Sequence, residues 1–450
     1  MAGLLSLVRR GLGRTHLVQV AAALARELHL GTDDLRALRL PVDLLQLFPR
    51  WHSGSTEGFH VPPARLTLLP EHAARPMRAL RLHVSPSTGS TAIVLTLLRD
   101  LRRTLDPSVR LVTIVDPETD ARELRRLAGV VIGQSACVRF LTMDFATIFA
   151  RDNAMAATDR DGHRVLLIPR AFRTLTNDGL EPLDVRATER RLGVRVVRSR
   201  LYWHGGNILF DGETLAIGAD TIAENATRLG LTRGEVSDIF VAELGQQVTV
   251  LGNPARGHFD TDRNRVVASG QASYHIDLDV ALLGRTRRHG RTALLADPHL
   301  GLAQLPAVLD RRWPGSPPYL SSPSAQALIA REYRLTARQR DPALRAYGRV
   351  LIARGYRVVR VPQLQTRGTE EGPGGLPGQD FVYCNVLPGL NRGRPAVHYV
   401  PWGIPRLDAA ARQSFLDAGV HPVRISRTAY LASAMMERAA GLRCFCGTLP

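Results

Sequence analysis

Short apolar runs alternate with amphipathic stretches along most of the chain from Met77 onward. Apolar residues at every second position or in short continuous runs predict strands, whereas apolar residues spaced three and four apart predict helices. Strands are therefore expected at Leu80–Val84, Leu111–Val115, Phe140–Met143, Val165–Ile168, Val194–Val197, Ile208–Phe210, Phe381–Val386, Ala396–Val400 and Val423–Ile425. Helices are expected at Thr91–Leu105, Asp120–Leu127, Ser324–Arg338, Ala343–Arg354 and Asp408–Ala418. Strands and helices follow one another without sequence repetition, which predicts an α/β fold and not a solenoid.

Two regions depart from this alternation. Residues 1–78 are expected to be a small helical region of unknown role, because Leu17–Leu30 is amphipathic and prolines punctuate the exit. Residues 79–450 are expected to form the main domain, with an insertion around 284–345 that begins in a stretch rich in Pro, Gly and Arg.

The stretch Ser273–Asp279 alternates polar and apolar residues, which predicts a strand. A period of two would place His275, Asp277 and Asp279 on one face. A carboxylate beside an imidazole can hold a cationic substrate while the imidazole moves protons. The alternative reading is an ion-paired strand edge without catalytic chemistry.

Composition changes this picture little. The net charge of +18 comes from 59 basic residues that are all Arg, spread along the chain with Ala, Gly, Leu and Pro. This pattern favours a nucleotide-composition bias of the source genome over a phosphate-binding surface, and aromatic residues make up only 6%. No apolar run reaches the roughly 18 residues that a membrane span needs. We therefore expect no nucleic acid and no membrane among the partners.

Four cysteines, Cys137, Cys384, Cys444 and Cys446, are too few and too scattered for a disulfide framework. Reduced thiols and a cytoplasmic location are the default expectation. Cys444 and Cys446 lie beside Arg443, so one of them is a candidate thiolate nucleophile. The alternative is that both are small buried hydrophobic residues.

Two more clusters carry polar groups at the ends of apolar runs. Arg151 and Asp152 follow one such run, as a helix cap, an ion pair or a ligand-binding carboxylate. The run His204–Asn207 includes Gly205 and Gly206, which permit close backbone approach to a ligand but are also typical of a simple turn.

In the order Arg-Asp, Gly-Gly-Asn, His-x-Asp and a Cys close to the C-terminus, these clusters resemble the guanidino-group modifying superfamily, nearest its peptidylarginine deiminase and agmatine deiminase branch. The resemblance covers roughly residues 80–450. It implies a pentein-type α/β propeller of ββαβ-like units, with residues 79–450 as the catalytic domain. The implied activity is hydrolysis of a guanidino group, of arginine in a peptide or protein or of a small guanidino compound, to a ureido group plus ammonia through a covalent Cys intermediate.

The resemblance also implies residue roles. Asp152 and Asp277 would hold the guanidinium, and His275 would protonate the departing ammonia and then activate water. The substrate-binding set would further include Arg151, His204, Gly206 and Asn207, and no metal is expected.

The nucleophile is either Cys444 or Cys446. The family pattern Gly-Gly-x-apolar-His-Cys-x-Thr aligned on Cys444 agrees at more upstream positions, although Arg443 stands at the His position. Alignment on Cys446 keeps Thr448 two residues further on. We favour Cys444 and keep Cys446 as the alternative.

His204 stands where free-arginine and agmatine deiminases have a Glu, whereas peptidylarginine deiminases lack an acid there, which favours a peptide substrate. Calcium is not supported, because Asp260–Asn264 is followed by Arg265 and Gln271 at the positions where an EF-type loop needs Gly and Glu. No cofactor is therefore expected. The alternatives are an amidinotransferase or dimethylargininase of the same superfamily, or an inactive pentein that binds without turnover.

Overall fold

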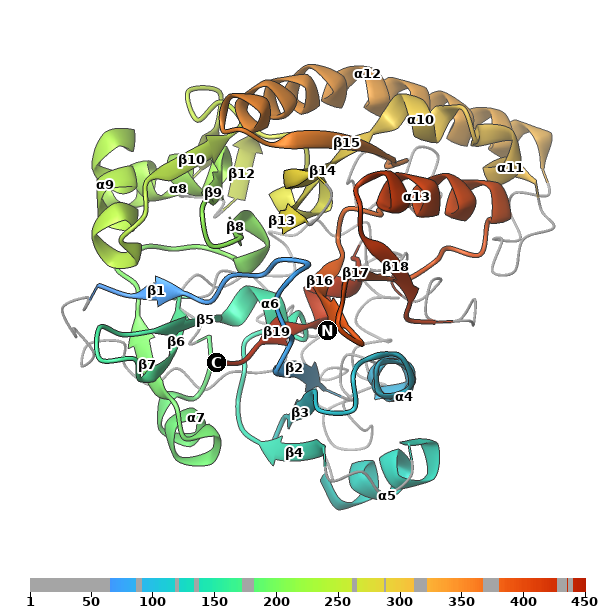
Figure 1. Ribbon diagram of the computed structural model, residues 1–450. Helices are drawn as coiled ribbons and strands as arrows, with labels where there is room; N and C mark the ends of the chain where they lie inside the picture. The colour runs from blue at the N-terminus through green and yellow to red at the C-terminus, as the bar shows by residue number, and fades with distance from the viewer. Residues whose placement is uncertain are drawn as a thin grey trace, which may run out of the picture.

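The computed structural model describes residues 65–85, 91–117, 121–132, 137–171, 182–260, 265–286, 289–310, 322–366, 380–426, 435 and 440–450. It shows a mixed α/β fold in which small sheets of two to four strands are accompanied by helices (Figure 1). The α/β expectation is therefore confirmed. Most of the predicted N-terminal helical region, residues 1–64, lies outside the described residues.

One structural unit recurs along the chain: an antiparallel strand pair, then helix, then a third strand parallel to the second. The first such unit contains β5 (Met155–Thr158), β6 (Arg164–Ile168), α7 (Val185–Leu192) and β7 (Arg195–Arg198). The second contains β8 (Ile208–Phe210), β9 (Leu215–Gly218), α8 (Ala219–Leu229), α9 (Arg233–Leu244) and β10 (Val248–Leu251). In each unit the crossover helix packs on the sheet, so the apolar face of the sheet is buried within the unit.

Two later segments repeat the arrangement. The third unit contains β13 (Val280–Thr286), β14 (Gly290–Asp297), α10 (Pro298–Leu302), α11 (Leu305–Leu309), α12 (Pro323–Ala353) and β15 (Arg357–Pro362). The fourth contains β16 (Leu387–Asn391), β17 (Arg394–Tyr399), α13 (Pro405–Asp417) and β18 (His421–Arg424). The stretch 284–345 thus supplies β14 and the helices of the third unit.

A fifth unit joins the two ends of the described chain. The C-terminal β19 (Gly447–Thr448) pairs antiparallel with β2 (Ala79–Val84), and β2 is parallel to β3 (Arg110–Val115). Along the chain, α4 (Thr91–Thr104) connects β2 to β3, and α5 (Ala121–Ile132) connects β3 to β4 (Val138–Thr142). Figure 1 shows β19 next to α6 (Ala150–Asn153) and β2, so the last residues enter the middle of the molecule.

The two short remaining strand sets attach to these units. β1 (Thr67–Leu68) pairs antiparallel with β5, and Leu66 and Leu68 are buried in the core beside the first and second units. β11 (His258–Asp260) and β12 (Arg265–Ala268) form a hairpin, whose connecting residues 261–264 lie outside the described residues. The described part of the region 65–78 is thus extended chain packed on the main body.

The predicted strand at Ser273–Asp279 is wrong. Ile276–Leu278 forms the 3-10 turn η5, and regular strand β13 begins only at Val280. A strand with one polar face would leave that face in water, but Ile276, Asp277 and Leu278 are all buried. The buried acids instead have charged partners inside the protein, Arg443 for Asp277 and Arg340 for Asp279.

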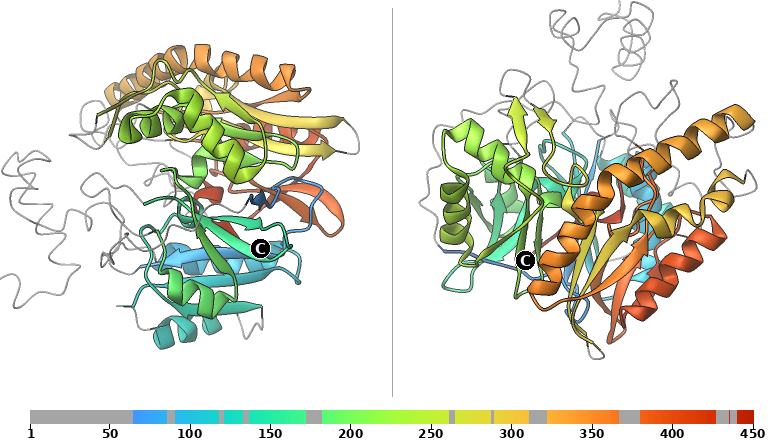
Figure 2. Two further views of the ribbon diagram at one scale, coloured as in Figure 1. Left: turned by 90° about the vertical axis from the view of Figure 1, so that its left-hand side faces the viewer. Right: turned by 90° about the horizontal axis from the view of Figure 1, so that it is seen from above.

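Two other expectations differ from the structure. Phe381–Val386 forms no strand and contributes only an isolated bridge between Phe381 and Leu364. The helices predicted at 324–338 and 343–354 are one helix, α12, which continues through Pro342. Figure 2 shows α12 crossing the molecule beside the strands of the third unit, so contact with β14 and β15 supports the helix despite its proline.

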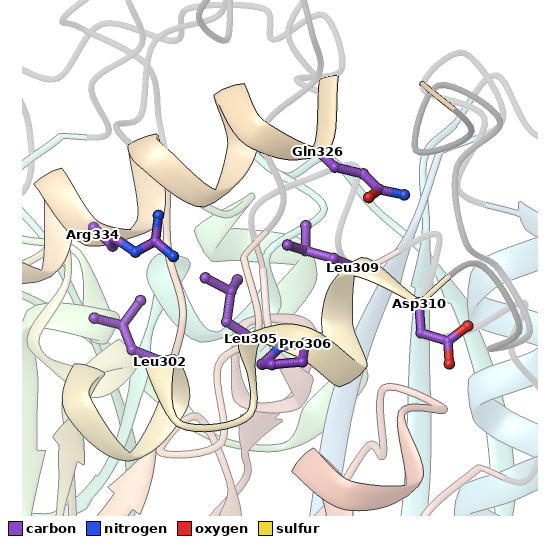
Figure 3. A pocket seen from close by; sticks show the side chains of 7 residues that line it. All are labelled: Leu302, Leu305, Pro306, Leu309, Asp310, Gln326 and Arg334. Atoms are coloured by element: carbon purple, nitrogen blue, oxygen red, sulfur yellow. The ribbon is translucent and has the colours of Figure 1, made fainter. Parts of the chain in front are cut away.

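A hollow of about 980 Å³ lies between α10, α11 and the first half of α12 (Figure 3). Leu302, Leu305 and Leu309 line one side, and Gln326 and Arg334 line the other. None of the candidate catalytic residues lines it. None of the described helices has the length and apolar character of a membrane span.

Candidate active site

The turn Gly205–Asn207 brings two of the predicted clusters together. The Gly206 amide donates a hydrogen bond of 3.0 Å to Asp152 Oδ1. A Cβ on Gly205 would lie 3.1 Å from the Arg151 carbonyl carbon, and one on Gly206 would lie 2.8 Å from His275 Cγ. The paired glycines are therefore required by close approach of α6 on one side and of the His275 ring on the other.

Asp152 is buried at the end of the apolar run that the sequence singled out. Burial raises the pKa of Asp152 and the nearby Asp277 raises it further, while His275, the Gly206 amide and Arg151 act in the opposite direction. A cationic ligand placed against this carboxylate would favour its charged form.

His275 lies between Asp152 and His204. Its Nδ1 is 3.8 Å from Asp152 Oδ1, and its Nε2 is 3.1 Å from His204 Nδ1, with the two rings edge to face at 83°. Asn207 fixes the backbone on both sides of the imidazole, because it accepts from the Ile276 amide at 3.0 Å and donates to the Tyr274 carbonyl at 3.3 Å. The imidazole is thus held by the Gly-Gly-Asn turn.

Asp277 has one partnered and one open oxygen. Its Oδ2 accepts a hydrogen bond of 2.7 Å from Arg443 Nη1. Its Oδ1 is buried, and among the described residues it has no hydrogen-bond partner. An acceptor left open in a buried carboxylate costs free energy unless a ligand or water satisfies it.

Cys444 lies in the short helix α15 (Leu442–Phe445), next to Asn385. Asn385 Oδ1 accepts from the Arg443 and Cys444 amides at 2.7 and 3.2 Å and lies 3.6 Å from Cys444 Sγ. Burial raises the pKa of the Cys444 thiol, and the charges of Asp277 and Asp152 raise it further. The thiol therefore lies within electrostatic range of both predicted guanidinium-holding acids.

Cys446 has different surroundings. It is buried in the hydrophobic core, and burial alone raises the pKa of its thiol. Of the two candidate nucleophiles, only Cys444 has the predicted acids among the groups that shift its pKa.

Glu71 is a half-buried acid of this region that the sequence reasoning did not identify. It bonds Arg151 through Oε1, Arg443 through Oε2 at 2.9 Å, and the Thr448 hydroxyl at 3.0 Å. Burial opposes its charge, but the two arginines outweigh this effect and lower the pKa of Glu71 to about 2. Its sequence neighbourhood, a proline-punctuated stretch before the first predicted strand, carries no motif that marks it.

The fold separates some predicted site residues from the others. Arg151 donates to the Gly205 and Ile208 carbonyls at 3.0 Å each and to Glu71, so its guanidinium is used in the protein interior. Asp279, which was not among the predicted site residues, pairs with Arg340 and accepts a hydrogen bond of 2.8 Å from the Ser273 hydroxyl. The residues that gather around the imidazole are Asp152, His204, Gly206 and Asn207, with Asp277 and Cys444 in electrostatic range of Asp152.

Comparison with known proteins identifies the fold. No family model matches the sequence, and no curated protein sequence matches it. Among solved structures, a protein assigned as a peptidyl-arginine deiminase matches with a TM-score of 0.54 and 12% identity, over 85% of this chain and 98% of that one.

The agmatine deiminase of C. jejuni also matches, with a TM-score of 0.54 and 12% identity over 87% of this chain and 98% of that one. Its substrate-bound variant matches with the same TM-score and 13% identity. These neighbours belong to the superfamily that the motif order resembles. At such low identity the likeness establishes a shared fold.

Proposed function

We propose that this chain is a deiminase that hydrolyses a guanidino group to a ureido group and ammonia. The observation that carries the proposal is the open, buried Oδ1 of Asp277 in the charged surroundings that Asp152 and Cys444 share. A guanidinium is planar and cationic, and it offers paired N–H donors to carboxylates. It would satisfy the open oxygen and neutralise two acids that otherwise raise the pKa of the thiol.

Substrate binding would activate the nucleophile. In the ligand-free site, burial and the negative charges of Asp277 and Asp152 favour the neutral thiol of Cys444. A bound guanidinium adds a positive charge beside both carboxylates, and this lowers the thiol pKa. The thiolate then forms where the electrophilic carbon is held.

The reaction is proposed in two balanced steps. Cys444 Sγ attacks the central guanidinium carbon, and the tetrahedral adduct expels one nitrogen as ammonia after His275 gives it a proton. The resulting thiouronium-type intermediate is attacked by water, from which His275 removes a proton. Collapse breaks the C–S bond, regenerates the thiol and releases the ureido product, so that one water is consumed and one ammonia is released.

An arginine side chain in a peptide or protein is the proposed substrate. His204 carries no negative charge and stands where the deiminases of free arginine and agmatine have a Glu. The site therefore offers fewer negative charges to a free small cation. Tyr274, next to His275, is 52% exposed and gives the site an aromatic surface toward solvent. A main chain on either side of the arginine would contact such a surface.

The finer architecture follows from the same proposal. We infer that the five described strand-helix units are arranged about one axis as a pentein-type propeller, with residues 79–450 as the catalytic domain. The pairing of β19 with β2, which joins the two ends of the described chain, supports this arrangement.

A second candidate is a protein that binds a guanidinium without turnover. The observation in its favour is the ion pair between Arg443 and Asp277, because an internal guanidinium already takes one oxygen of a substrate-holding acid. In that case ligands bind and no ammonia is released.

The test measures ammonia and ureido product after incubation with an arginine-containing peptide, free arginine and agmatine. We expect product from the peptide, its loss in Cys444→Ala, and much of the native rate in the matched Cys446→Ala variant. If Cys446→Ala is the inactive variant, the nucleophile assignment is wrong by two residues. If the native protein releases no ammonia from any of the three compounds, the binding protein replaces the deiminase.

A further inference from the structure

Asp152, His204 and His275 form a cluster of metal-binding atom types. One ligand atom from each residue can be chosen so that all three lie within 4.8 Å of one another. Asp152 and His275 are buried and His204 is half-buried, so the cluster lies inside the molecule beside Cys444. The fold assembles it from α6, the residue before the 3-10 turn η4 (Gly205–Asn207) and the residue before η5, and the two histidines are 71 residues apart in the sequence.

The composition of the cluster matches a particular class of ion. Two imidazole nitrogens and one carboxylate oxygen form the ligand set that Zn²⁺ takes in sites with an open fourth position. Ligand atoms around a tetrahedral zinc ion lie about 3.3 to 3.5 Å apart, given bonds of about 2.0 to 2.2 Å. His204 Nδ1 and His275 Nε2 are 3.1 Å apart, which is close to this spacing, and Asp152 Oδ1 lies 3.8 Å from the other imidazole nitrogen, His275 Nδ1.

We propose that Asp152, His204 and His275 bind one Zn²⁺ ion. Without metal, one proton lies between His204 Nδ1 and His275 Nε2, because two imidazole nitrogens at 3.1 Å need a hydrogen between them. The ion takes the place of this proton, which moves to the other ring nitrogen of the imidazole that carries it. The Asn207 contacts that fix the backbone around His275 pre-organise one ligand of the site.

The ion and a guanidino substrate exclude each other, and this consequence rests on the proposed function. Both need the Asp152 carboxylate, and both need the lone pair or proton of His275. Zinc would therefore be an inhibitor of the deiminase, and His204 would be the residue that gives the site its metal affinity. The zinc site itself does not depend on catalysis.

A second cluster of similar composition provides a matched comparison. Asp159, Asp161 and His163 also bring ligand atoms within 4.8 Å of one another, but Asp161 and His163 are exposed. Asp159 Oδ1 already accepts the Asp161 and His163 amides at 3.0 and 2.9 Å, so the carboxylate is used by the turn. We treat this cluster as a surface turn, and His163 is the control position.

The experiment titrates the full chain, without a histidine tag, with ZnSO₄ by calorimetry and with Co²⁺ by visible absorption. We expect one tight ion per chain and a tetrahedral cobalt spectrum. His204→Ala should lower the zinc affinity by at least about tenfold. His163→Ala should leave it unchanged.

Thermal unfolding keeps the test informative if a variant is less stable. Zn²⁺ should raise the Tm of the native chain and of His163→Ala, because it binds only the folded state, and should leave that of His204→Ala unchanged. Equal zinc affinity in the native chain and His204→Ala would overturn the proposal, as would loss of the ion in His163→Ala alone. None of these readouts uses a substrate, so a failed deiminase assay leaves the metal result standing.

Discussion

Asp277 is a buried acid of the candidate site with one ion-paired oxygen and one oxygen that is open to a ligand. Arg443 neutralises one of its oxygens at 2.7 Å, and the other is buried with no hydrogen-bond partner among the described residues. Arg443 also binds Glu71, so removal of the Asp277 charge would not leave this arginine without an acid. The effect of such a change should therefore appear in substrate binding and chemistry more than in folding.

We expect Asp277→Asn to lower kcat/KM for an arginine-containing peptide by at least about a hundredfold, which corresponds to about 3 kcal/mol of lost transition-state stabilisation. The physical reason is that a guanidinium loses one of its two charged acceptors. The measurement is initial-rate kinetics of ammonia release, normalised to folded protein.

The matched control for this change is Asp279→Asn, which removes an equally buried carboxylate two residues away. Asp279 pairs with Arg340 on the scaffold side, so this variant should lose stability while its folded fraction keeps most of its kcat/KM. Near-native kinetics in Asp277→Asn would remove this acid from the substrate-binding set.

At this scale, the residues chosen from the sequence lie near one another in the structure, and their catalytic roles stay predictions. Asp152, His275, Asp277 and Cys444 could be chosen because each residue type suits one task in guanidine chemistry. Glu71 could not be found, because its role depends on two arginines that are 80 and 372 residues away in the chain. Arg151 was predicted to bind substrate, because the groups that accept its hydrogen bonds inside the protein are distant in the sequence.

At the scale of elements, the two short turns η4 and η5 form the site between them. Their backbones approach closely enough that Gly206 has no room for a side chain beside the His275 ring. The backbone of Gly206 does not adopt a positive φ, so the requirement for glycine comes from space alone. This permits a substitution that moves the imidazole without straining the turn.

We expect Gly206→Ala to abolish most activity, because the new methyl group would displace the His275 imidazole from Asp152 and His204. The fold should survive, since the affected neighbour is a side chain and not backbone. The checks are peptide deimination and far-UV circular dichroism during heating.

The matched control is Gly129→Ala in α5, where nothing lies within 4 Å of an added Cβ. Alanine is the better helix former, so this variant should be unchanged in activity and up to about 1 kcal/mol more stable. Native-like activity in Gly206→Ala would show that the imidazole position near Gly206 is not the working one.

Pattern reasoning was reliable for strands and helices that bury one face and unreliable for these turns. The helix predicted at 91–105 and the strand predicted at 208–210 agree with α4 and β8. The alternation at 273–279 predicted a strand, but there both the apolar residues and the acids are buried. In a sequence, an acid with a buried ionic partner cannot be distinguished from an acid that faces solvent. The alternation at 273–279 therefore predicts a strand with one solvent-facing side.

At the scale of the whole molecule, one buried ionic cluster ties distant parts of the chain together. Glu71 comes from the segment after β1, Arg151 from α6, and Arg443 from α15, close to the C-terminus. Thr448 in β19 adds a hydrogen bond of 3.0 Å to the same carboxylate. Loss of this one charge would therefore weaken contacts among the segment after β1, α6, α15 and β19.

The pKa of Glu71 makes this connection sensitive to acid. The folded-state pKa is about 2 against an ordinary value of 4.5, so the folded state favours the charged carboxylate. The stabilisation is fully present above about pH 4.5 and is lost as the pH falls toward 2. A difference of about 2.5 pKa units corresponds to roughly 3 kcal/mol of unfolding free energy.

We expect Glu71→Gln to be less stable than the native chain at pH 7, and the difference to shrink steadily between about pH 4.5 and 2. Asp152 and Asp279, whose raised pKa values favour the folded state on acidification, are common to both proteins, so they largely cancel in the difference. Urea unfolding at a series of pH values measures the effect.

Glu213→Gln is the control. The pKa of Glu213 is also lowered, mainly by Arg285, but this ion pair is exposed and should contribute less than about 1 kcal/mol of unfolding free energy. A Glu71→Gln difference that stays constant down to pH 2 would mean that the cluster stabilises the molecule by packing and not by charge.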